Sequence, residues 1–149
     1  MSSFNIDITN ISDVLKKLDK FNEEVQQNVK DEVNASALNI LSSAKRLAPI
    51  DLGTLRRSIF LKEKDLDNGG YVFTVGASRK LAPYAPYIEF GTGGEVTVPK
   101  GYEELAILFK GKNLRKINIR PQPFLIPSFE NEKPKLIDNI LKVVKNAKP

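Results

Sequence analysis

The spacing of apolar residues in the first third of the chain changes from every second position to every third or fourth. Phe4, Ile6 and Ile8 alternate with polar residues, a pattern that predicts a short, half-buried strand. Across residues 11–47 the apolar positions lie three or four apart, which predicts one long amphipathic helix ending before a proline. Such a helix measures roughly 50 Å, more than the diameter of a domain this size, so we expect part of it to pack outside its own chain. The alternative is a break near residues 34–36 that folds two shorter helices onto one core.

The middle of the chain predicts a hairpin followed by a stiff segment. Residues 59–64 and 71–75 form two strands around the sequence Asp-Asn-Gly-Gly, which suits the positive φ angles of a tight hairpin turn. In residues 81–94 two prolines space two tyrosines ahead of a predicted short strand that ends at glycines. We interpret residues 93–116 as a projecting loop or arm.

The last part of the chain predicts a second helix. Residues 121–129 place prolines where the first turn of a helix tolerates them, and an amphipathic face continues over residues 136–144. Pro134 predicts a kink or a restart within this helix. The fold class expected for the single domain 1–149 is therefore α+β, with a long N-terminal and a C-terminal helix packed on a small antiparallel sheet with a projecting loop.

Composition removes several classes of chemistry. The chain has neither cysteine nor histidine, which excludes thiolate nucleophiles, cysteine-ligated zinc and serine-histidine catalysis. No signal peptide and no apolar run of membrane-spanning length is recognised, so we expect no membrane association. The net charge of +5 is compatible with a small basic DNA-binding protein, but acidic residues are interspersed among the basic ones, which favours a mixed solvated surface.

Glu89 is the strongest catalytic candidate, because its apolar neighbours Ile88 and Phe90 could raise its pKa by burial. Acid-base hydrolysis needs a second carboxylate or a metal, and none stands nearby in a recognisable pattern. We interpret the side chain instead as an acceptor for Gly91, Thr92 or a basic group. A hydrolase would lose activity without unfolding in Glu89→Gln, whereas we expect that change to harm assembly or solubility.

The turn that follows the long helix resembles a phosphate-binding loop only superficially. It has a lone glycine, Gly53, and no lysine after it, so a structural turn is the better interpretation. We expect Asp51 to accept the amide of Gly53 or Thr54. Arg56 and Arg57 then remain available for carboxylates of a neighbouring molecule or for the DNA backbone.

Aromatic and basic residues later in the chain offer a possible nucleic-acid contact. Tyr84, Tyr87 and Phe90 could stack on bases, but core packing is the commoner use of such residues. The predicted arm and its flank carry an excess of positive charge, which could face a DNA channel or an acidic neighbouring ring. Any such contact would be to phosphates and would weaken as salt rises. The basic residues are Lys100, Lys110, Lys112, Arg115, Lys116 and Arg120.

Three motifs follow the long helix in a fixed order, at residues 48–59, 84–92 and 122–129. Together they resemble the phage neck and tail-component family, encoded among the head-tail joining genes of long-tailed phages and prophages. The resemblance runs from about residue 30 to residue 145, and the ordered set is more specific than any single motif. The motif residues read as structural turn positions are Pro49, Asp51, Gly53, Thr54, Leu55, Tyr84, Tyr87, Glu89, Phe90, Gly91, Thr92, Pro123, Phe124 and Pro127.

The resemblance implies a structural role and no reaction, cofactor or metal. Family members are expected to form a homo-oligomeric ring that joins the capsid to the tail tube around the DNA channel. The expected partners are head-closure or portal-side proteins and tail tube or tail terminator proteins, with non-specific contact to passing DNA. The expected location is the neck or tail of the virion, assembled in the host bacterial cytoplasm.

Overall fold

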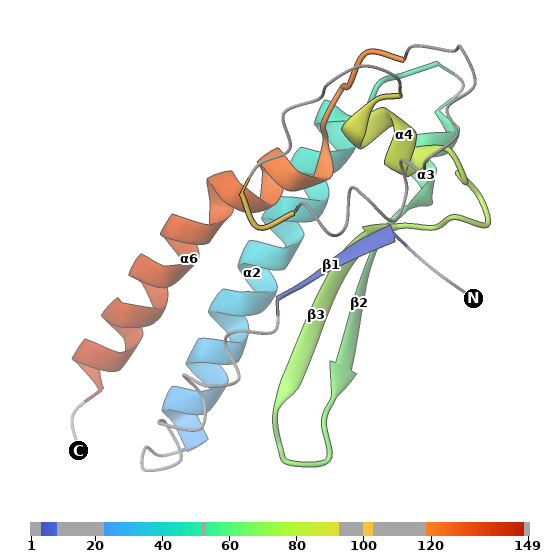
Figure 1. Cartoon of the computed structure of the whole chain (residues 1–149). Helices are drawn as coiled ribbons and strands as arrows, with labels where there is room; N and C mark the ends of the chain where they lie inside the picture. Colours follow the sequence, from blue (N-terminus) through green and yellow to red (C-terminus); the bar gives the residue numbers. More distant parts are fainter. Residues whose placement is uncertain (1–3, 9–22, 52, 93–99, 103–118, 148–149) are drawn as a thin grey trace.

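The computed structural model describes residues 4–8, 23–51, 53–92, 100–102 and 119–147. Two long helices lie side by side, and a small sheet packs beside the first of them (Figure 1). This is the α+β architecture predicted from the sequence. In chain order the elements are β1 (Phe4–Ile8), α2 (Glu23–Leu47), α3 (Thr54–Ser58), β2 (Ile59–Asp65), β3 (Tyr71–Ala77), α4 (Ala85–Phe90) and α6 (Leu125–Asn146).

Helix α2 runs without a break for 25 residues, about 37 Å, so the alternative of two shorter helices is wrong. Its apolar face packs against α6 and the sheet of its own chain. The C-terminal helix and the sheet cover most of this face, but Leu38 and Leu47 of α2 remain 48% and 44% exposed, so the expectation that part of the helix packs outside its own chain stays a prediction. Residues 9–22 lie outside the described residues. The buried apolar residues of α2 are Val25, Val29, Val33, Ala37, Ile40 and Ala44.

The sheet has three antiparallel strands in the order β1-β3-β2. Phe4 of β1 and Ile59 of β2 both pair with Ala77 of the central strand. The predicted hairpin is confirmed, and its turn contains Gly69 at φ 78°. In the same turn the Gly70 amide donates to Asn68 Oδ1 at 3.1 Å. The glycine-rich sequence thus sets the turn, as its positive-φ preference predicts.

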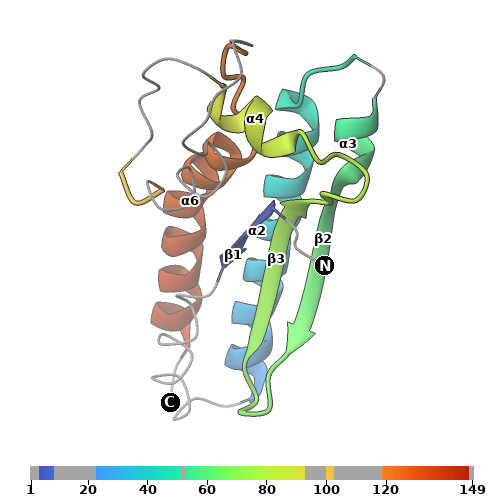
Figure 2. The same ribbon diagram turned by 45° about the vertical axis from the view of Figure 1, so that its right-hand side comes forward.

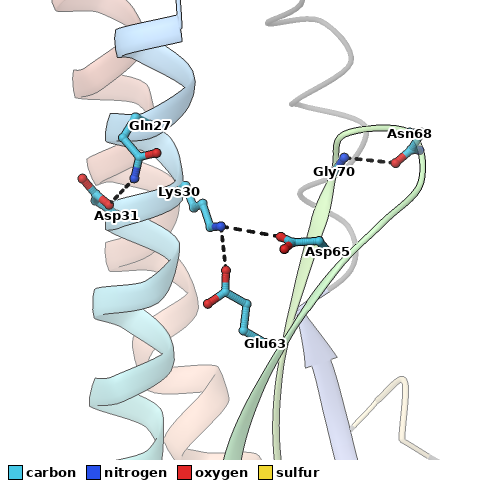
Figure 3. A network of polar contacts seen from close by, with 7 residues as sticks. All are labelled: Gln27, Lys30, Asp31, Glu63, Asp65, Asn68 and Gly70. Atoms are coloured by element: carbon cyan, nitrogen blue, oxygen red, sulfur yellow. Dashed lines mark hydrogen bonds and ion pairs between the residues drawn. The ribbon is translucent and has the colours of Figure 1, made fainter.

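A lysine of α2 ties the helix to the turn end of the hairpin (Figure 3). Lys30 Nζ lies 2.6 Å from Glu63 Oε1 and 3.6 Å from Asp65 Oδ1. The same ammonium lies 5.3 Å from the centroid of the Tyr71 ring. Glu63 raises the pKa of Lys30, and burial raises the pKa of Tyr71. The contact is a partly exposed ion-pair network rather than a buried one.

Polar side chains set the alignment of the two long helices. Glu132 of α6 is 8% exposed and accepts hydrogen bonds from Ser36 Oγ at 3.1 Å and Asn39 Nδ2 at 2.9 Å. Further along the same interface, Asn139 Nδ2 donates to Glu32 Oε2 at 3.1 Å. Asn139 follows Glu132 along α6, whereas its partner Glu32 precedes Ser36 and Asn39 along α2. The two helices therefore run antiparallel. Specific bonds of this kind fix one register where apolar packing alone would allow several.

Two local predictions differ from the structure. Helix α6 continues through Pro134, so a restart there is wrong. Residues 85–90 form α4 rather than the predicted strand. Pro86 stands in the first turn of α4, where a missing amide proton costs nothing. The Gly91 amide closes the helix by donating to the Tyr87 carbonyl at 2.8 Å.

Candidate interaction surface

The three sequence motifs come together at one end of the helix pair. Helices α3 and α4 lie beside the C-terminal end of α2, and α6 begins at that same end (Figures 1 and 2). We name this region the motif end and define it as residues 45–58, 78–92 and 119–130, without Leu52. Segments separated in the chain by residues 59–77 and 93–118 thus form one surface.

Glu89 joins the second motif to the third through the main chain. Its side chain is 3% exposed, and Oε2 accepts the amides of Phe124 at 2.8 Å and Leu125 at 2.9 Å. Oε1 accepts the Ile126 amide at 2.9 Å. First-turn amides have no partner within their helix, and a carboxylate there also meets the positive end of the helix dipole. Glu89 therefore caps α6, whose own N-cap residue Phe124 makes no side-chain cap.

The sequence-based interpretation of Glu89 was wrong about its hydrogen-bond donors. The Gly91 amide bonds to Tyr87, and the Thr92 amide donates to the Ile119 carbonyl at 3.0 Å. The reason is that α4 is a helix, so residue 89 faces α6 rather than the following turn. Burial raises the pKa of the Glu89 carboxyl, while the three amide hydrogen bonds act in the opposite direction.

Gly91 permits a close contact between the end of α4 and the segment before α6. Its φ is 71°, and a Cβ built on it would lie 2.7 Å from the Ile119 carbonyl oxygen and 2.8 Å from Pro121 Cδ. The Ile119 amide in turn donates to Thr92 Oγ1 at 2.9 Å. Glycine is required here for conformation and for space. With Glu89, it makes the α4–α6 junction one tightly bonded unit.

The first motif forms α3 around Gly53, which is the N-cap of that helix at φ 71°. Asp51 is exposed, and among the described residues its carboxylate does not bond the amide of Gly53 or Thr54, so that prediction is wrong. The helix begins at a left-handed glycine without a side-chain cap. Leu55 is buried, and its carbonyl accepts the Ser58 hydroxyl at 2.7 Å.

The aromatic residues of the second motif divide between surface and core. Phe90 is 3% exposed and packs edge to face on Phe4, with ring centroids 5.8 Å apart. Tyr84 and Tyr87 are 40% and 39% exposed, so the prediction that they pack in the core is wrong. The two tyrosines stand three residues apart and so share one face of the α4 turn.

The motif end is apolar and positively charged. Beside the two tyrosines, Leu47, Ile50 and Leu81 are 44%, 68% and 56% exposed. Two exposed acidic residues, Asp51 and Glu130, lie in this region, and a third, Glu89, is buried, so basic residues outnumber acidic ones there. The basic residues of this region are Lys45, Arg46, Arg56, Arg57, Arg79, Lys80 and Arg120.

Sequence reasoning missed the exposed apolar residues Leu47, Ile50 and Leu81. The signal available was that the apolar spacing of the long helix continues to its last residue and that another apolar residue follows the proline. Of the other predicted positions, Phe124 is fully buried, while Pro49 and Pro127 are half-buried. Exposed among them are Pro123, Arg57, Lys100 and Arg120, whereas Lys110, Lys112, Arg115 and Lys116 lie outside the described residues, as does most of 93–116.

The described part of the chain offers no alternative site of familiar chemistry. It contains no group of three or more acidic residues placed to hold a metal ion. None of the described helices has the length and apolar character needed to cross a membrane. What distinguishes the motif end is therefore its surface, which suits contact with another macromolecule.

Comparison with known protein families gives a match. A family model described as "Bacteriophage HK97-gp10, putative tail-component" matches residues 12–91, more than half of the chain. The match includes α2, the hairpin and α4. No curated protein and no solved structure matches the chain.

Proposed function

Because the chain belongs to the HK97-gp10-like family of bacteriophage tail components, we propose that it is a subunit of the connector between capsid and tail. A tail component is a structural protein, and the chain is not an enzyme. Its partners are other virion proteins. In the proposal, copies of the chain form a ring around the DNA channel of the neck, after assembly in the host bacterial cytoplasm.

The observation that carries this proposal is the surface of the motif end. Exposed aromatic and aliphatic side chains lie there among basic ones, and exposed apolar patches with a polar rim are typical of protein contacts. The Glu89 cap and Gly91 hold α4 firmly on α6, so the tyrosines of α4 are positioned before a partner arrives. A surface ordered in advance loses less entropy on binding.

The family match also guides the choice of neighbours. A ring needs a heterologous contact, in which one patch meets a different patch of the next copy. The remaining faces then contact the head-closure or portal-side proteins on one side and the tail tube or tail terminator on the other. Basic side chains that line the channel contact passing DNA through its phosphates alone.

The proposal is tested by removing the gene from the phage that encodes this chain and supplying variants in trans. Without the protein, electron microscopy should show full capsids and separate tails in place of joined particles. The wild type should restore joining, whereas Tyr84→Ala with Tyr87→Ala should restore it poorly while remaining folded. Leu38→Ala, at a residue 48% exposed on α2 away from the motif end, is the matched control. Joined particles in the absence of the protein contradict the proposal.

The basic side chains of the motif end also support a second candidate, a small basic DNA-binding protein. Phosphate contacts predict non-specific binding that weakens steeply with salt. A gel-shift titration of the isolated protein from low to physiological salt separates the two. Tight binding at physiological salt, together with normal particles in the deletion phage, favours the DNA-binding protein; binding confined to low salt favours the connector subunit.

A further inference from the structure

A pocket of about 430 Å³ opens between the two long helices near the start of α2 and the end of α6. This is the opposite end of the helix pair from α3 and α4 (Figures 1 and 2). We name it the far pocket. Its lining residues are Glu24, Val25, Asn28, Asp31, Glu32, Val143, Asn146 and Ala147.

The far pocket is apolar in part of its lining and acidic in the rest. Val25 is 6% exposed, and Val143 and Ala147 are half-buried, so part of the wall is hydrocarbon. Glu24 and Asp31 are exposed, and none of the residues that line the pocket is basic. An occupant that matches this chemistry presents an apolar side chain surrounded by positive charges.

The motif end has that character. Ile50 is 68% exposed just beyond the last turn of α2. Exposed Arg46, Arg57 and Lys80 belong to the same surface, which also carries Leu47. We propose that the motif end of one copy docks on the far pocket of the next, so that the chain assembles head to tail. This inference rests on the proposed function as a self-assembling subunit and names the two surfaces that meet.

Charge selects this arrangement over a symmetric one. In a dimer that joins two motif ends, two positively charged surfaces face each other. In a dimer that joins two far pockets, two acidic surfaces face each other. Juxtaposed like charges oppose association, whereas a contact between the two different ends pairs opposite charges. A contact between unlike patches leaves one free surface at each end, so assembly continues until rotation closes a ring.

Charge reversal tests the proposal on the full chain. Sedimentation velocity of the wild type over a range of concentrations should show self-association that weakens as salt is raised. Arg57→Glu with Lys80→Glu, at the motif end, should raise the dissociation constant about tenfold or more. Glu24→Lys with Asp31→Lys, at the far pocket, should do the same. Lys62→Glu with Lys133→Glu changes the net charge as much as the motif-end pair does but lies outside both surfaces, and should leave association unchanged.

Mixing the two reversed proteins makes the test specific. Each retains one native surface, so the two proteins should associate when mixed in equal amounts, through the native motif end of one and the native far pocket of the other and also through the two reversed surfaces. Placing all four reversals on one chain should restore self-association. A wild type that stays monomeric at high concentration, or association that neither double reversal weakens, overturns the proposal. If the reversed variants still join capsids to tails as the wild type does, the head-to-tail contact is wrong and the connector function stands.

Discussion

The two ends of the helix pair are fastened to the rest of the fold by different interactions. At the motif end, a buried carboxylate accepts three main-chain amides, and a glycine lets two backbone segments touch. At the hairpin end, Lys30 reaches Glu63 and Asp65 through side chains that water still contacts. Breaking a buried hydrogen bond leaves an unsatisfied polar group, which costs a large part of the free energy of unfolding. An exposed ion pair is replaced by contacts with water at little cost. We therefore expect the motif end to be the rigid one.

The largest effect is expected for Glu89→Ala. It leaves three amides of the α6 first turn without an acceptor in a buried position, which should cost about 3 to 5 kcal/mol of unfolding free energy. Urea denaturation followed by circular dichroism measures the change. Glu24→Ala, at an exposed glutamate of α2, is the control and should shift stability by no more than about 0.5 kcal/mol. A loss at residue 89 as small as that of the control would refute the capping role.

The next largest effect is expected for Gly91→Ala. The added methyl group meets the Ile119 carbonyl oxygen at 2.7 Å, and the positive φ disfavours any side chain. Strain and displacement together should cost about 2 to 4 kcal/mol. Gly69→Ala in the hairpin turn separates the two causes, because its φ is 78° but an added Cβ there meets nothing within 4 Å. Equal losses at both glycines would show that φ alone matters.

The pH dependence of stability reports on Glu89 directly. Because burial raises its pKa above the ordinary 4.5, the folded state binds this proton more tightly than the unfolded state does. The stability that this group contributes is greatest below pH 4.5 and is lost as pH rises through the folded pKa, with a slope of at most about 1.4 kcal/mol per pH unit. Urea titrations of the wild type and Glu89→Gln from pH 4 upward should differ in this slope. Parallel curves would rule out proton uptake at residue 89.

The smallest effect is expected for the Lys30–Glu63 ion pair at the hairpin end. A double-mutant cycle of Lys30→Met and Glu63→Gln should give a coupling of about 0.3 to 1 kcal/mol, since both side chains are partly exposed. The coupling should shrink as salt is raised. Lys62→Met, on the same strand as Glu63, provides the matched single control. A coupling as large as the loss in Glu89→Ala would erase the proposed difference between the two ends.

Much of the scaffold was predictable because its signals are local. The three-and-four spacing of Val25, Val29 and Val33 reveals the buried face of α2, and the glycine pair after Asn68 reveals the hairpin. Residues 85–90 are too short and too apolar for periodicity to separate a helical turn from a strand, so the pattern predicts a strand where the structure has α4.

The candidate surface was less predictable because it depends on distant partners. Glu89 bonds to amides 35 or more residues away, and main-chain amides carry no sequence signature. The exposure of Tyr84 and Tyr87 depends on which face of α4 turns towards α6, and the sequence alone does not determine that face. The ordered motifs nevertheless identified the segments that meet, and the family match confirms the tail-component assignment.

The Glu89 cap recognises peptide groups rather than side chains, and this has an evolutionary consequence. Exposed positions in and around the segment it holds, such as Pro123, can change without loosening the junction, provided the amides of residues 124–126 remain in place. The exposed residues around this junction can thus change along with a binding partner that mutates, while the buried Glu89 cap is kept. Among relatives, we expect an acid at position 89 to persist where the exposed residues around it diverge.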